Sequence, residues 1–253
     1  MEYPEIDRYA SLKSPIHQFD PRAKIITFSI LIFSFVFVNN LTIAGMNLFF
    51  TFVLLLISRL PLNFVFNRIK WVFLFVLPFL IIMPFTVSGS ELASIAGIKM
   101  TYEGFMYGSL IVLRAIAAVT LVLTMLGTMR FDTTIKALYM LKIPGLFIQM
   151  LMFTYRYIFV FLSDFLSMWK AMSSKGFKLR SNIYTLSILG NLIGMLIVKS
   201  YERAENVYHS MISKGYTGNQ KTLVKFNMAT KDYALTIVLI GIAILPHVCS
   251  MVI

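Results

Sequence analysis

Long apolar stretches are the feature of this sequence that most limits its possible folds. A helix needs about 20 mostly apolar residues to cross the hydrocarbon core of a membrane. Hydrophobic residues make up 58% of the chain and charged residues only 13%, a composition that would leave a soluble domain covered with apolar patches. We therefore predict an all-α polytopic membrane protein with about five transmembrane helices. The predicted spans are residues 24 to 38, 41 to 57, 71 to 87, 107 to 129 and 233 to 252.

The distribution of positive charge predicts the orientation of these helices. Lys and Arg are enriched in short cytoplasmic loops, and they occur both in the N-terminal arm and in the connection with Arg59, Arg68 and Lys70. The N-terminus is therefore expected in the cytoplasm, without a cleavable signal sequence, and residues 88 to 106 outside. Residues 130 to 231 are then cytoplasmic and contain 14 of the 23 Lys and Arg residues.

This pattern divides the chain into three predicted regions. Residues 1 to 129 form an N-terminal arm with four transmembrane helices, residues 130 to 231 a cytoplasmic or interfacial module, and residues 232 to 253 a C-terminal transmembrane helix. The basic module lies beside the lipid bilayer, so its charge is expected to attract anionic lipid and a protein partner. Nucleic acid is not an expected partner.

Two long helices are predicted within the module. Residues 147 to 174 contain no Pro or Gly, and at 1.5 Å per residue such a helix reaches about 40 Å. Arg156 lies in the polar sector of this helix. A second helix, from about residue 183 to 214, contains Gly190 and Gly194. The spacing of these glycines permits a close crossing of the two long helices, but it is equally consistent with ordinary membrane packing.

Each long helix ends in a copy of the same short motif. The first copy is Lys-Ala-Met-Ser-Ser-Lys-Gly-Phe at residues 170 to 177, and the second is His-Ser-Met-Ile-Ser-Lys-Gly-Tyr at residues 209 to 216. Lys near a helix end with Gly beyond it is typical of a C-terminal cap, which explains each copy taken singly. The duplication in register favours docking into two equivalent sockets. The candidate docking residues are Met172, Ser174, Lys175, Gly176, Met211, Ser213, Lys214 and Gly215.

The order of these elements resembles the transmembrane coupling component, or T component, of energy-coupling factor transporters. Within that family it resembles the CbiQ-type branch, which is associated with cobalt and nickel uptake. The resemblance covers nearly the whole chain. It is carried by His17-Gln-Phe-Asp20-Pro21-Arg22-Ala-Lys24, by Leu138 to Pro144, by Tyr155-Arg156-Tyr157, by Tyr201-Glu202-Arg203-Ala-Glu-Asn-Val-Tyr208, and by the second motif copy with Tyr216-Thr217-Gly218.

The resemblance implies a coupling subunit of an ATP-driven importer. Two ATP-binding cassette ATPases would each receive one motif in a groove, and a separate small membrane subunit, the S component, would bind the substrate. Cobalt or nickel is the implied cargo, with a vitamin as the alternative, and a bacterial or archaeal plasma membrane is the implied location. In this family the motif reads like Ala-Arg-Gly, so Lys175 and Lys214 stand where Arg is common. Lys keeps the charge but makes single contacts instead of paired ones.

Other classes of function find less support in the residues. The sequence contains no Gly-x-x-x-x-Gly-Lys-Ser/Thr phosphate loop, so ATP is assigned to partner subunits and no enzymatic activity or cofactor to this chain. Its three His residues are widely separated and its Cys is single, so no metal site is predicted.

A stand-alone secondary carrier is the alternative from another class. Such a carrier needs polar or ionisable groups at mid-membrane depth. Arg114, in the fourth predicted span, is such a group unless it bonds to backbone carbonyls near one helix end. The Asp20-Pro21-Arg22 element is expected to cap the first membrane helix and to fix where the chain enters the membrane.

Overall fold

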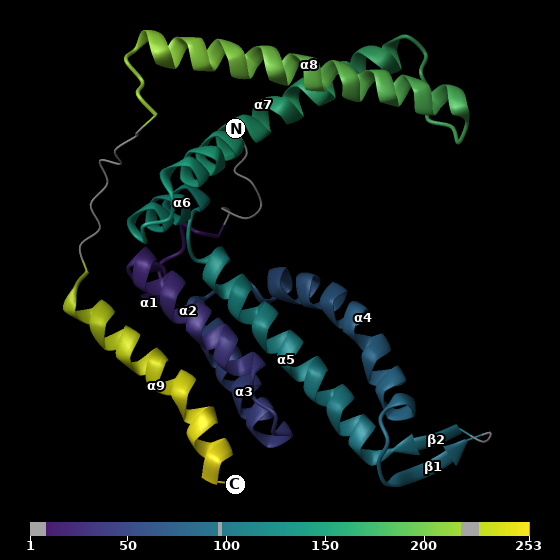
Figure 1. Cartoon of the computed structure of the whole chain (residues 1–253), viewed down its shortest axis with the longest axis vertical. Helices are drawn as coiled ribbons and strands as arrows, with labels where there is room; N and C mark the ends of the chain where they lie inside the picture. Colours follow the sequence, from purple (N-terminus) through teal and green to yellow (C-terminus); the bar gives the residue numbers. More distant parts are fainter. Residues whose placement is uncertain (1–8, 96–97, 219–227, 253) are drawn as a thin grey trace. The chain divides into compact units, whose positions relative to one another are not determined.

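The chain is almost entirely helical (Figure 1). A computed structural model describes residues 9–95, 98–218 and 228–252. The chain forms two compact units. Unit 1 comprises residues 1–137 and 225–253, and unit 2 comprises residues 138–224. The C-terminal helix therefore belongs to the same unit as the N-terminal helices.

Unit 1 contains most of the described helices and two short strands. Helix α6 (Phe131–Met140) runs across the boundary into unit 2, which otherwise contains α7 (Gly145–Ser174) and α8 (Ile183–Ser213). The other elements of unit 1 are α1 (Pro15–Gln18), α2 (Pro21–Val36), α3 (Leu41–Ser58), α4 (Leu62–Thr86), β1 (Glu91–Ile95), β2 (Ile98–Thr101), α5 (Tyr102–Gly127) and α9 (Thr230–Val252).

Helix α5 packs against α2, α3 and α4, and α9 packs against α2 and α3. The resulting core includes Phe28 and Leu31 of α2, Leu121 of α5 and Leu239 of α9, all of which are buried. In a membrane this core is stabilised by van der Waals packing more than by removal from water, because lipid tails are as apolar as Leu. The packing of α2 against α9 places the C-terminal helix beside one of the first helices of the chain.

Local sequence sets where α3 begins and where α4 bends. The Asn40 side chain accepts a hydrogen bond from the backbone N–H of Thr42 at 3.0 Å, which satisfies a free donor at the start of α3. Pro78 and Pro84 lie inside α4, which is visibly curved in Figure 1. Proline removes a backbone donor and clashes with the preceding turn, so these residues account for the curvature.

A β-hairpin follows α4, where the sequence predicted only an external connection between helices. Strands β1 and β2 pair antiparallel, with Ile95 opposite Ile98. The Glu103 carboxylate accepts hydrogen bonds from the backbone N–H of Ser90 at 2.7 Å and from its hydroxyl at 3.0 Å. These bonds close the base of the hairpin at the start of α5. Strands this short have a weak sequence signal, because only a few residues define their alternation.

Six of the described helices, α3, α4, α5, α7, α8 and α9, are long and apolar enough to span a membrane. The prediction of an all-α polytopic membrane protein is confirmed, and the six candidate helices differ in two respects from the five predicted spans. Helix α2 occupies the first predicted span and has only 16 residues, fewer than the six candidates. Helices α7 and α8 were assigned to the cytoplasmic or interfacial module, yet their length and composition satisfy the same criterion as the membrane helices.

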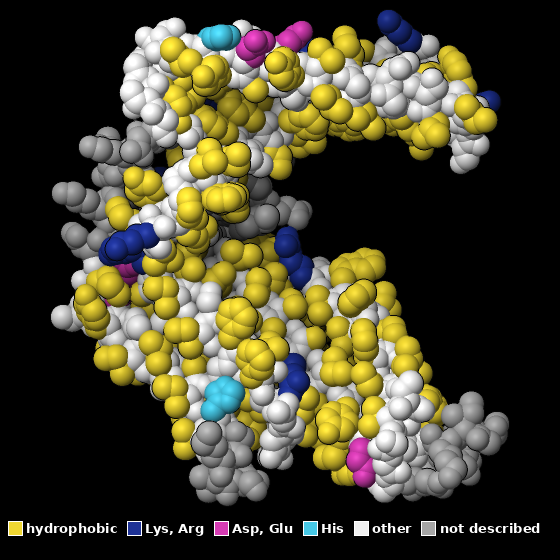
Figure 2. Space-filling view, in the orientation of Figure 1, with side chains coloured by type: hydrophobic (Ala, Val, Ile, Leu, Met, Phe, Trp, Pro, Cys, Tyr) yellow, Lys and Arg dark blue, Asp and Glu magenta, His cyan; other side chains and the backbone are white. Residues whose placement is uncertain are grey.

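Unit 2 is built on the antiparallel pair of α7 and α8, which have 30 and 31 residues. The pairing brings Asp164 of α7 to Arg203 of α8 and Gln149 near the start of α7 to Tyr216 just beyond α8. Most side chains of these helices are exposed, and Figure 2 shows hydrophobic side chains over much of their visible surface. Such faces favour contact with lipid or with another apolar protein surface.

Candidate docking motifs at the tips of two long helices

The first motif copy closes the C-terminal end of α7 in a Schellman arrangement. The backbone N–H of Phe177 donates to the carbonyl of Met172 at 3.1 Å, and that of Gly176 donates to the carbonyl of Ser173 at 3.0 Å. Lys175 is the C-cap residue. Gly176 has a φ of +85°, in the left-handed region that residues with a Cβ avoid. The glycine is therefore required by the backbone of the helix end.

The second copy closes α8 in the same way. The N–H of Tyr216 donates to the carbonyl of Met211 at 3.0 Å, and that of Gly215 donates to the carbonyl of Ile212 at 2.8 Å. Lys214 is the C-cap residue, and Gly215 has a φ of +81°. The predicted glycine cap is confirmed at both ends. The two copies are thus equivalent in backbone geometry as well as in sequence.

The two motif serines are used within their own helices. The hydroxyls of Ser174 and Ser213 donate to the carbonyls four residues earlier, at 3.0 and 2.9 Å. Lys175 and Lys214 are exposed, and within the described chain neither ammonium group has a hydrogen bond or ion pair. At these shared positions the Lys side chains, and not the Ser hydroxyls, are therefore available for an intermolecular contact.

The aromatic residues of the two copies are held differently. Phe177 packs edge-on against Trp169 of α7, with ring centroids 6.0 Å apart. The hydroxyl of Tyr216 instead bonds to the side-chain oxygen of Gln149 at 2.5 Å, which ties the tip of α8 to the beginning of α7. The first tip is thus stabilised by its own helix, and the second by the neighbouring helix.

The two tips lie at opposite ends of the α7 and α8 pair. Tyr216 contacts Gln149, and Gln149 is separated along α7 from Ser174 by about 37 Å at a rise of 1.5 Å per residue. This distance is far larger than a single binding groove for a helix end. The two motifs are therefore too far apart to enter one such groove together.

Each tip borders a hollow with several cations. The hollow beside the first tip has a volume of about 520 Å³ and that beside the second about 620 Å³. One acidic residue, Glu202, lines the second hollow. Such surfaces are complementary to a partner with an acidic rim. The lining cations are Lys175, Lys178 and Arg180 at the first tip and Arg156, Lys199, Arg203 and Lys214 at the second.

An ion pair joins the two long helices between the tips. The Arg203 guanidinium donates to the Asp164 carboxylate at 2.9 Å, and both side chains are about one-third exposed. Beside this pair, a largely apolar hollow of about 520 Å³ separates the helices and is lined by residues such as Phe153, Tyr157 and Val207. Arg203 belongs to one of the segments that carry the family resemblance, and it contacts the other long helix.

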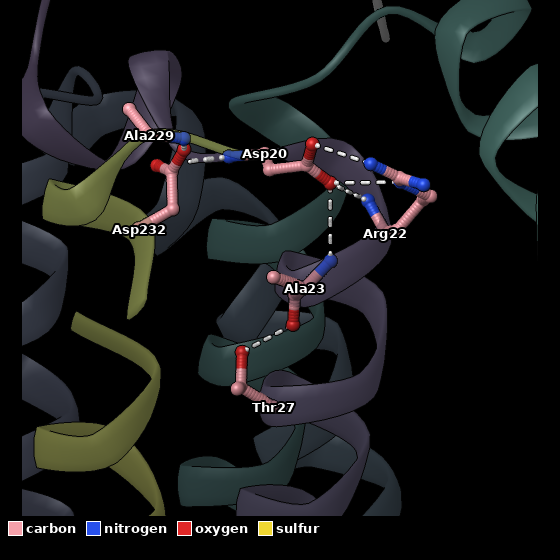
Figure 3. Close-up of polar contacts among 6 residues, drawn as sticks. All are labelled: Asp20, Arg22, Ala23, Thr27, Ala229 and Asp232. Atoms are coloured by element: carbon pink, nitrogen blue, oxygen red, sulfur yellow. Dashed lines mark hydrogen bonds and ion pairs between the residues drawn. The ribbon is translucent and has the colours of Figure 1, made fainter. Parts of the chain in front are cut away.

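The Asp20-Pro21-Arg22 element begins α2 (Figure 3). One carboxylate oxygen of Asp20 accepts the backbone N–H groups of Arg22 at 2.9 Å and Ala23 at 3.4 Å. Pro21 occupies the first helical position, and the Arg22 guanidinium pairs with Asp20 at 3.4 Å. The predicted cap is confirmed, and the geometry places these residues at a helix start far along the chain from either motif.

Asp232 has a structural role that the sequence did not predict. Its two carboxylate oxygens accept the backbone N–H groups of Asp20 at 3.3 Å and of Ala229 at 2.9 Å, as Figure 3 shows. Asp20 and Asp232 are only 5% and 7% exposed. One carboxylate thus stabilises the start of α9 and joins it to the start of α2. No local pattern signals this contact, because its partners are 212 positions apart.

Lys24 is a second residue whose role was missed. It is the fourth residue of α2 and is 1% exposed, and its ammonium donates to the backbone carbonyl of Thr128 at 3.4 Å. A buried ammonium is costly unless it is paired or hydrogen-bonded. Lys24 therefore fixes the start of α2 to the end of α5. A Lys at the start of the first apolar stretch was the sequence signal that could have indicated this role.

Arg114 adopts the structural alternative that the sequence analysis left open. Its guanidinium donates to the backbone carbonyl of Val38 and to the side-chain oxygen of Asn39, the latter at 2.8 Å. These acceptors lie just beyond α2, where unsatisfied carbonyls and the helix dipole favour a cation. Arg114 thus connects α5 to the C-terminal end of α2.

Gly190 and Gly194 do not form the helix crossing that their spacing suggested. A Cβ built on either glycine has nothing within 4 Å in the described chain, and both residues are exposed. Helices α7 and α8 contact each other elsewhere, through Asp164 with Arg203 and through Gln149. The side-chain hydrogen bonds between the two helices are therefore made by longer residues at other positions.

The fold and the two tips define a class of protein: a polytopic helical membrane protein that presents two equivalent basic helix ends. The model of the CbiQ family, described as cobalt transport protein, matches residues 12–223. The chain therefore belongs to the CbiQ family, and it is a transmembrane T component of energy-coupling factor transporters.

Several relatives are similar over most of their length. The energy-coupling factor transporter transmembrane protein EcfT of Heliobacterium modesticaldum is 28% identical over 257 residues, which cover 95% of each chain. That of Streptococcus thermophilus is 30% identical over 229 residues, covering 85% of this chain and 86% of the relative. An uncharacterized protein of Methanocaldococcus jannaschii is 27% identical over 237 residues, covering 90% and 80%.

Proposed function

We propose that this T component transmits the ATP-driven motion of two ATPase subunits to a separate substrate-binding membrane subunit that captures cobalt or nickel. Each ATPase receives one motif tip in a groove with an acidic rim. ATP is bound and hydrolysed by the ATPases, and this chain requires no cofactor, metal or catalytic residue of its own. The tips and the N-terminus lie on the cytoplasmic side of a bacterial or archaeal plasma membrane.

The observation that carries this proposal is the equivalence of the two helix tips. Both end in the same two backbone hydrogen bonds, both place Lys at the C-cap, and about 37 Å of α7 separates them. Two matching tips at that separation suit two copies of the same partner. The ion pair between Arg203 and Asp164 joins the helices that carry the tips, so a displacement of one helix is transmitted to the other.

The charge distribution supports the proposed orientation of unit 1. Basic residues occur where α2 begins, where α3 ends and in the first half of α4, which is the side that positive charge marks as cytoplasmic. These basic residues are Arg22, Lys24, Arg59, Arg68 and Lys70.

The buried polar groups of unit 1 support a coupling role over a carrier role. The hydroxyls of Thr27, Thr51, Thr120 and Thr124 each donate to the backbone carbonyl four residues earlier. Hydroxyls engaged in this way stabilise their own helices and offer little to a passing solute. Arg114 is likewise engaged at the end of α2. The exposed apolar faces of α7 and α8 instead suit a sliding contact with another membrane protein.

Cobalt or nickel as cargo is argued from the family alone. The matching family is described as cobalt transport protein, whereas the EcfT relatives carry no cargo in their names. In this mechanism the S component chooses the substrate. Identification of the S component that copurifies with this chain therefore tests the cargo directly. A partner that binds a vitamin and no metal ion would overturn the cobalt or nickel proposal but leave the coupling role intact.

The docking proposal is tested by exchanging charge at both tips. We expect the double variant Lys175→Glu and Lys214→Glu to lose the ATPases when the tagged chain is extracted gently and its partners are identified by mass spectrometry. The matched control is Lys70→Glu with Lys142→Glu, which makes the same change of charge at two exposed positions that line neither hollow. Normal copurification of the ATPases with the tip variant would contradict the docking proposal.

A further inference from the structure

Three cations from distant parts of the sequence surround one hollow in unit 1. Lys13 precedes α1, Arg59 follows α3, and Lys231 lies in the first turn of α9. The hollow has a volume of about 500 Å³, and Pro15 and Leu235 provide apolar parts of its lining. It lies where α2 and α9 begin and α3 ends, and the ends of membrane-spanning helices are where lipid headgroups are found.

The positive charge of this hollow is not neutralised within the described chain. The side chains of Lys13, Arg59 and Lys231 have no hydrogen bond or ion pair among the residues that the structure describes. Asp232 also lines the hollow, but its carboxylate oxygens already accept the N–H groups of Asp20 and Ala229 (Figure 3). The hollow therefore has three cations to one engaged carboxylate and attracts an anion.

The backbone of Arg59 provides an independent indication that this side chain is used. Arg59 is the C-cap residue of α3 and has a φ of +56°, in the left-handed region. Glycine or asparagine is favoured there, because other residues clash through their Cβ. A strained residue at such a position is a reason to look for a function of its side chain. Here the side chain adds the third cation to the hollow.

We propose that this hollow binds a phosphate group. Three cations surround a space large enough for a phosphodiester headgroup, and charge-assisted hydrogen bonds from Lys and Arg are strong with phosphate oxygens. An anionic phospholipid is one source of the phosphate, with its acyl chains along the apolar lining, and free phosphate is the other. Basic pockets between membrane helices bind anionic headgroups in this way. The site would anchor the starts of α2 and α9 and the end of α3 to the lipid.

The test measures binding of defined probes to the purified full-length chain in zwitterionic detergent. Native mass spectrometry follows titrations with phosphatidylglycerol, phosphatidylcholine and inorganic phosphate. We expect phosphatidylglycerol to bind more tightly than phosphatidylcholine. The triple variant Lys13→Gln, Arg59→Gln and Lys231→Gln should weaken phosphatidylglycerol binding at least tenfold, because each cation near a membrane surface is worth about fivefold.

The matched control distinguishes a built site from diffuse attraction. The variant Lys142→Gln, Arg180→Gln and Lys199→Gln removes the same charge from exposed positions of unit 2 and should retain phosphatidylglycerol affinity within about twofold. If only inorganic phosphate binding is lost from the first variant, free phosphate is the ligand. Equal weakening in both variants, or unchanged binding of both probes, overturns the proposal. Loss of ATPase copurification with unchanged lipid binding assigns the hollow to a protein partner and also overturns it.

A second measurement uses the unaltered chain and does not depend on the folding of a variant. The chain is reconstituted in vesicles that contain a photoactivatable phosphatidylglycerol, and the cross-linked peptides are identified by mass spectrometry. We expect cross-links at residues 13 to 15, at the junction of α3 and α4, and at the start of α9. Cross-links spread evenly over the helix ends of unit 1 would contradict a specific site.

Discussion

At the scale of single residues, the structure separates what shapes the helix tips from what a partner can contact. Gly176 and Gly215 set the left-handed backbone, and the motif serines bond within their own helices. At the shared motif positions, Lys175 and Lys214 are exposed and have no side-chain partner within the described chain. The glycine role is therefore a matter of backbone geometry, whereas the Lys role is a proposal about recognition.

The glycines of the tips are expected to be sensitive to an added methyl group. Gly176→Ala and Gly215→Ala should each destabilise the end of a long helix by about 1 kcal/mol, because Ala disfavours positive φ. Gly190→Ala and Gly194→Ala are matched controls inside α8 with open space around the Cβ, and each should be neutral or stabilising by up to about 1 kcal/mol. Thermal unfolding of the full chain in detergent measures the difference. Equal effects at all four sites would contradict this account.

Asp20 offers a comparison between two substitutions at one position. Asp20→Ala should destabilise the protein by about 1 kcal/mol or more, because the N–H groups of Arg22 and Ala23 lose their acceptor. Asp20→Asn keeps a side-chain oxygen for the cap and loses only the charge that faces the Arg22 guanidinium. Its effect on the unfolding temperature should be smaller. If Asn were as harmful as Ala, the ion pair and not the cap would dominate.

At the scale of elements, several helix ends are fixed by side chains from other helices. Arg114 of α5 bonds to the residues beyond α2, Lys24 of α2 bonds to the end of α5, and Asp232 of α9 bonds to the start of α2. Helix ends carry unsatisfied backbone groups, and in a membrane water is not available to satisfy them at depth. These contacts therefore determine how the membrane helices are placed along one another.

The short helix α1 gives the protein a predicted pH dependence. His17 donates from Nε2 to the Tyr9 carbonyl at 3.0 Å and lies 2.7 Å from the Ser14 hydroxyl through Nδ1. Burial lowers the pKa of His17 below its usual value, the Tyr9 carbonyl opposes this shift, and the charge of Lys24 adds to it. The unfolded chain thus takes up a proton near pH 6.5 before the folded chain does, and stability falls as the pH is lowered.

The measurement is thermal unfolding of the full chain between pH 7.5 and pH 5.5. The wild type should lose more stability over this range than His17→Asn, which has no titrating ring at this position. The pKa of His17 is lowered in the folded state. Neutral His17 therefore contributes stability that is present at high pH and is lost as the pH falls. Parallel pH profiles for the two proteins would show that His17 does not contribute.

At the scale of the whole molecule, the proposed mechanism depends on rigid transmission through unit 2. Two long helices carry the two tips, and described side-chain links between them are the Asp164 pair with Arg203 and the Gln149 bond with Tyr216. The rest of their surface is largely exposed and apolar. A change at a link should therefore affect coupling between the partners more than the docking of either tip.

A charge exchange tests this transmission. Asp164→Arg and Arg203→Asp, made singly, should lower ion uptake by the complete transporter several-fold while the ATPases still copurify, because each variant places like charges across the helix pair. The pair itself is partly exposed and worth about 0.2–1 kcal/mol. The double variant restores opposite charges and should recover most of the uptake. Full uptake in both single variants would indicate that this link carries no motion.

The sequence alone determined the features that depend on neighbours a few residues away. Apolar stretches of membrane length are a property of contiguous sequence. The Asp20 cap and the glycine ends of both long helices depend on hydrogen bonds between residues at most five positions apart. The duplicated motif and the matching order of elements also pointed to the family that the comparisons establish. The short hairpin and the exact number of helices long enough to span a membrane were not predicted, because short strands and borderline lengths have weak local signals.

Only the tertiary structure decided which distant side chains meet. The packing of α9 beside α2 places Asp232 against the backbone of Asp20, and α5 brings Arg114 to the end of α2. The same packing gathers Lys13, Arg59 and Lys231 around one hollow. Gly190 and Gly194 are the opposite case: their spacing suggested a close helix crossing, but neither has a neighbour near its Cβ position in the described chain. Contacts across hundreds of positions depend on how whole helices pack, and a local sequence pattern does not encode that choice.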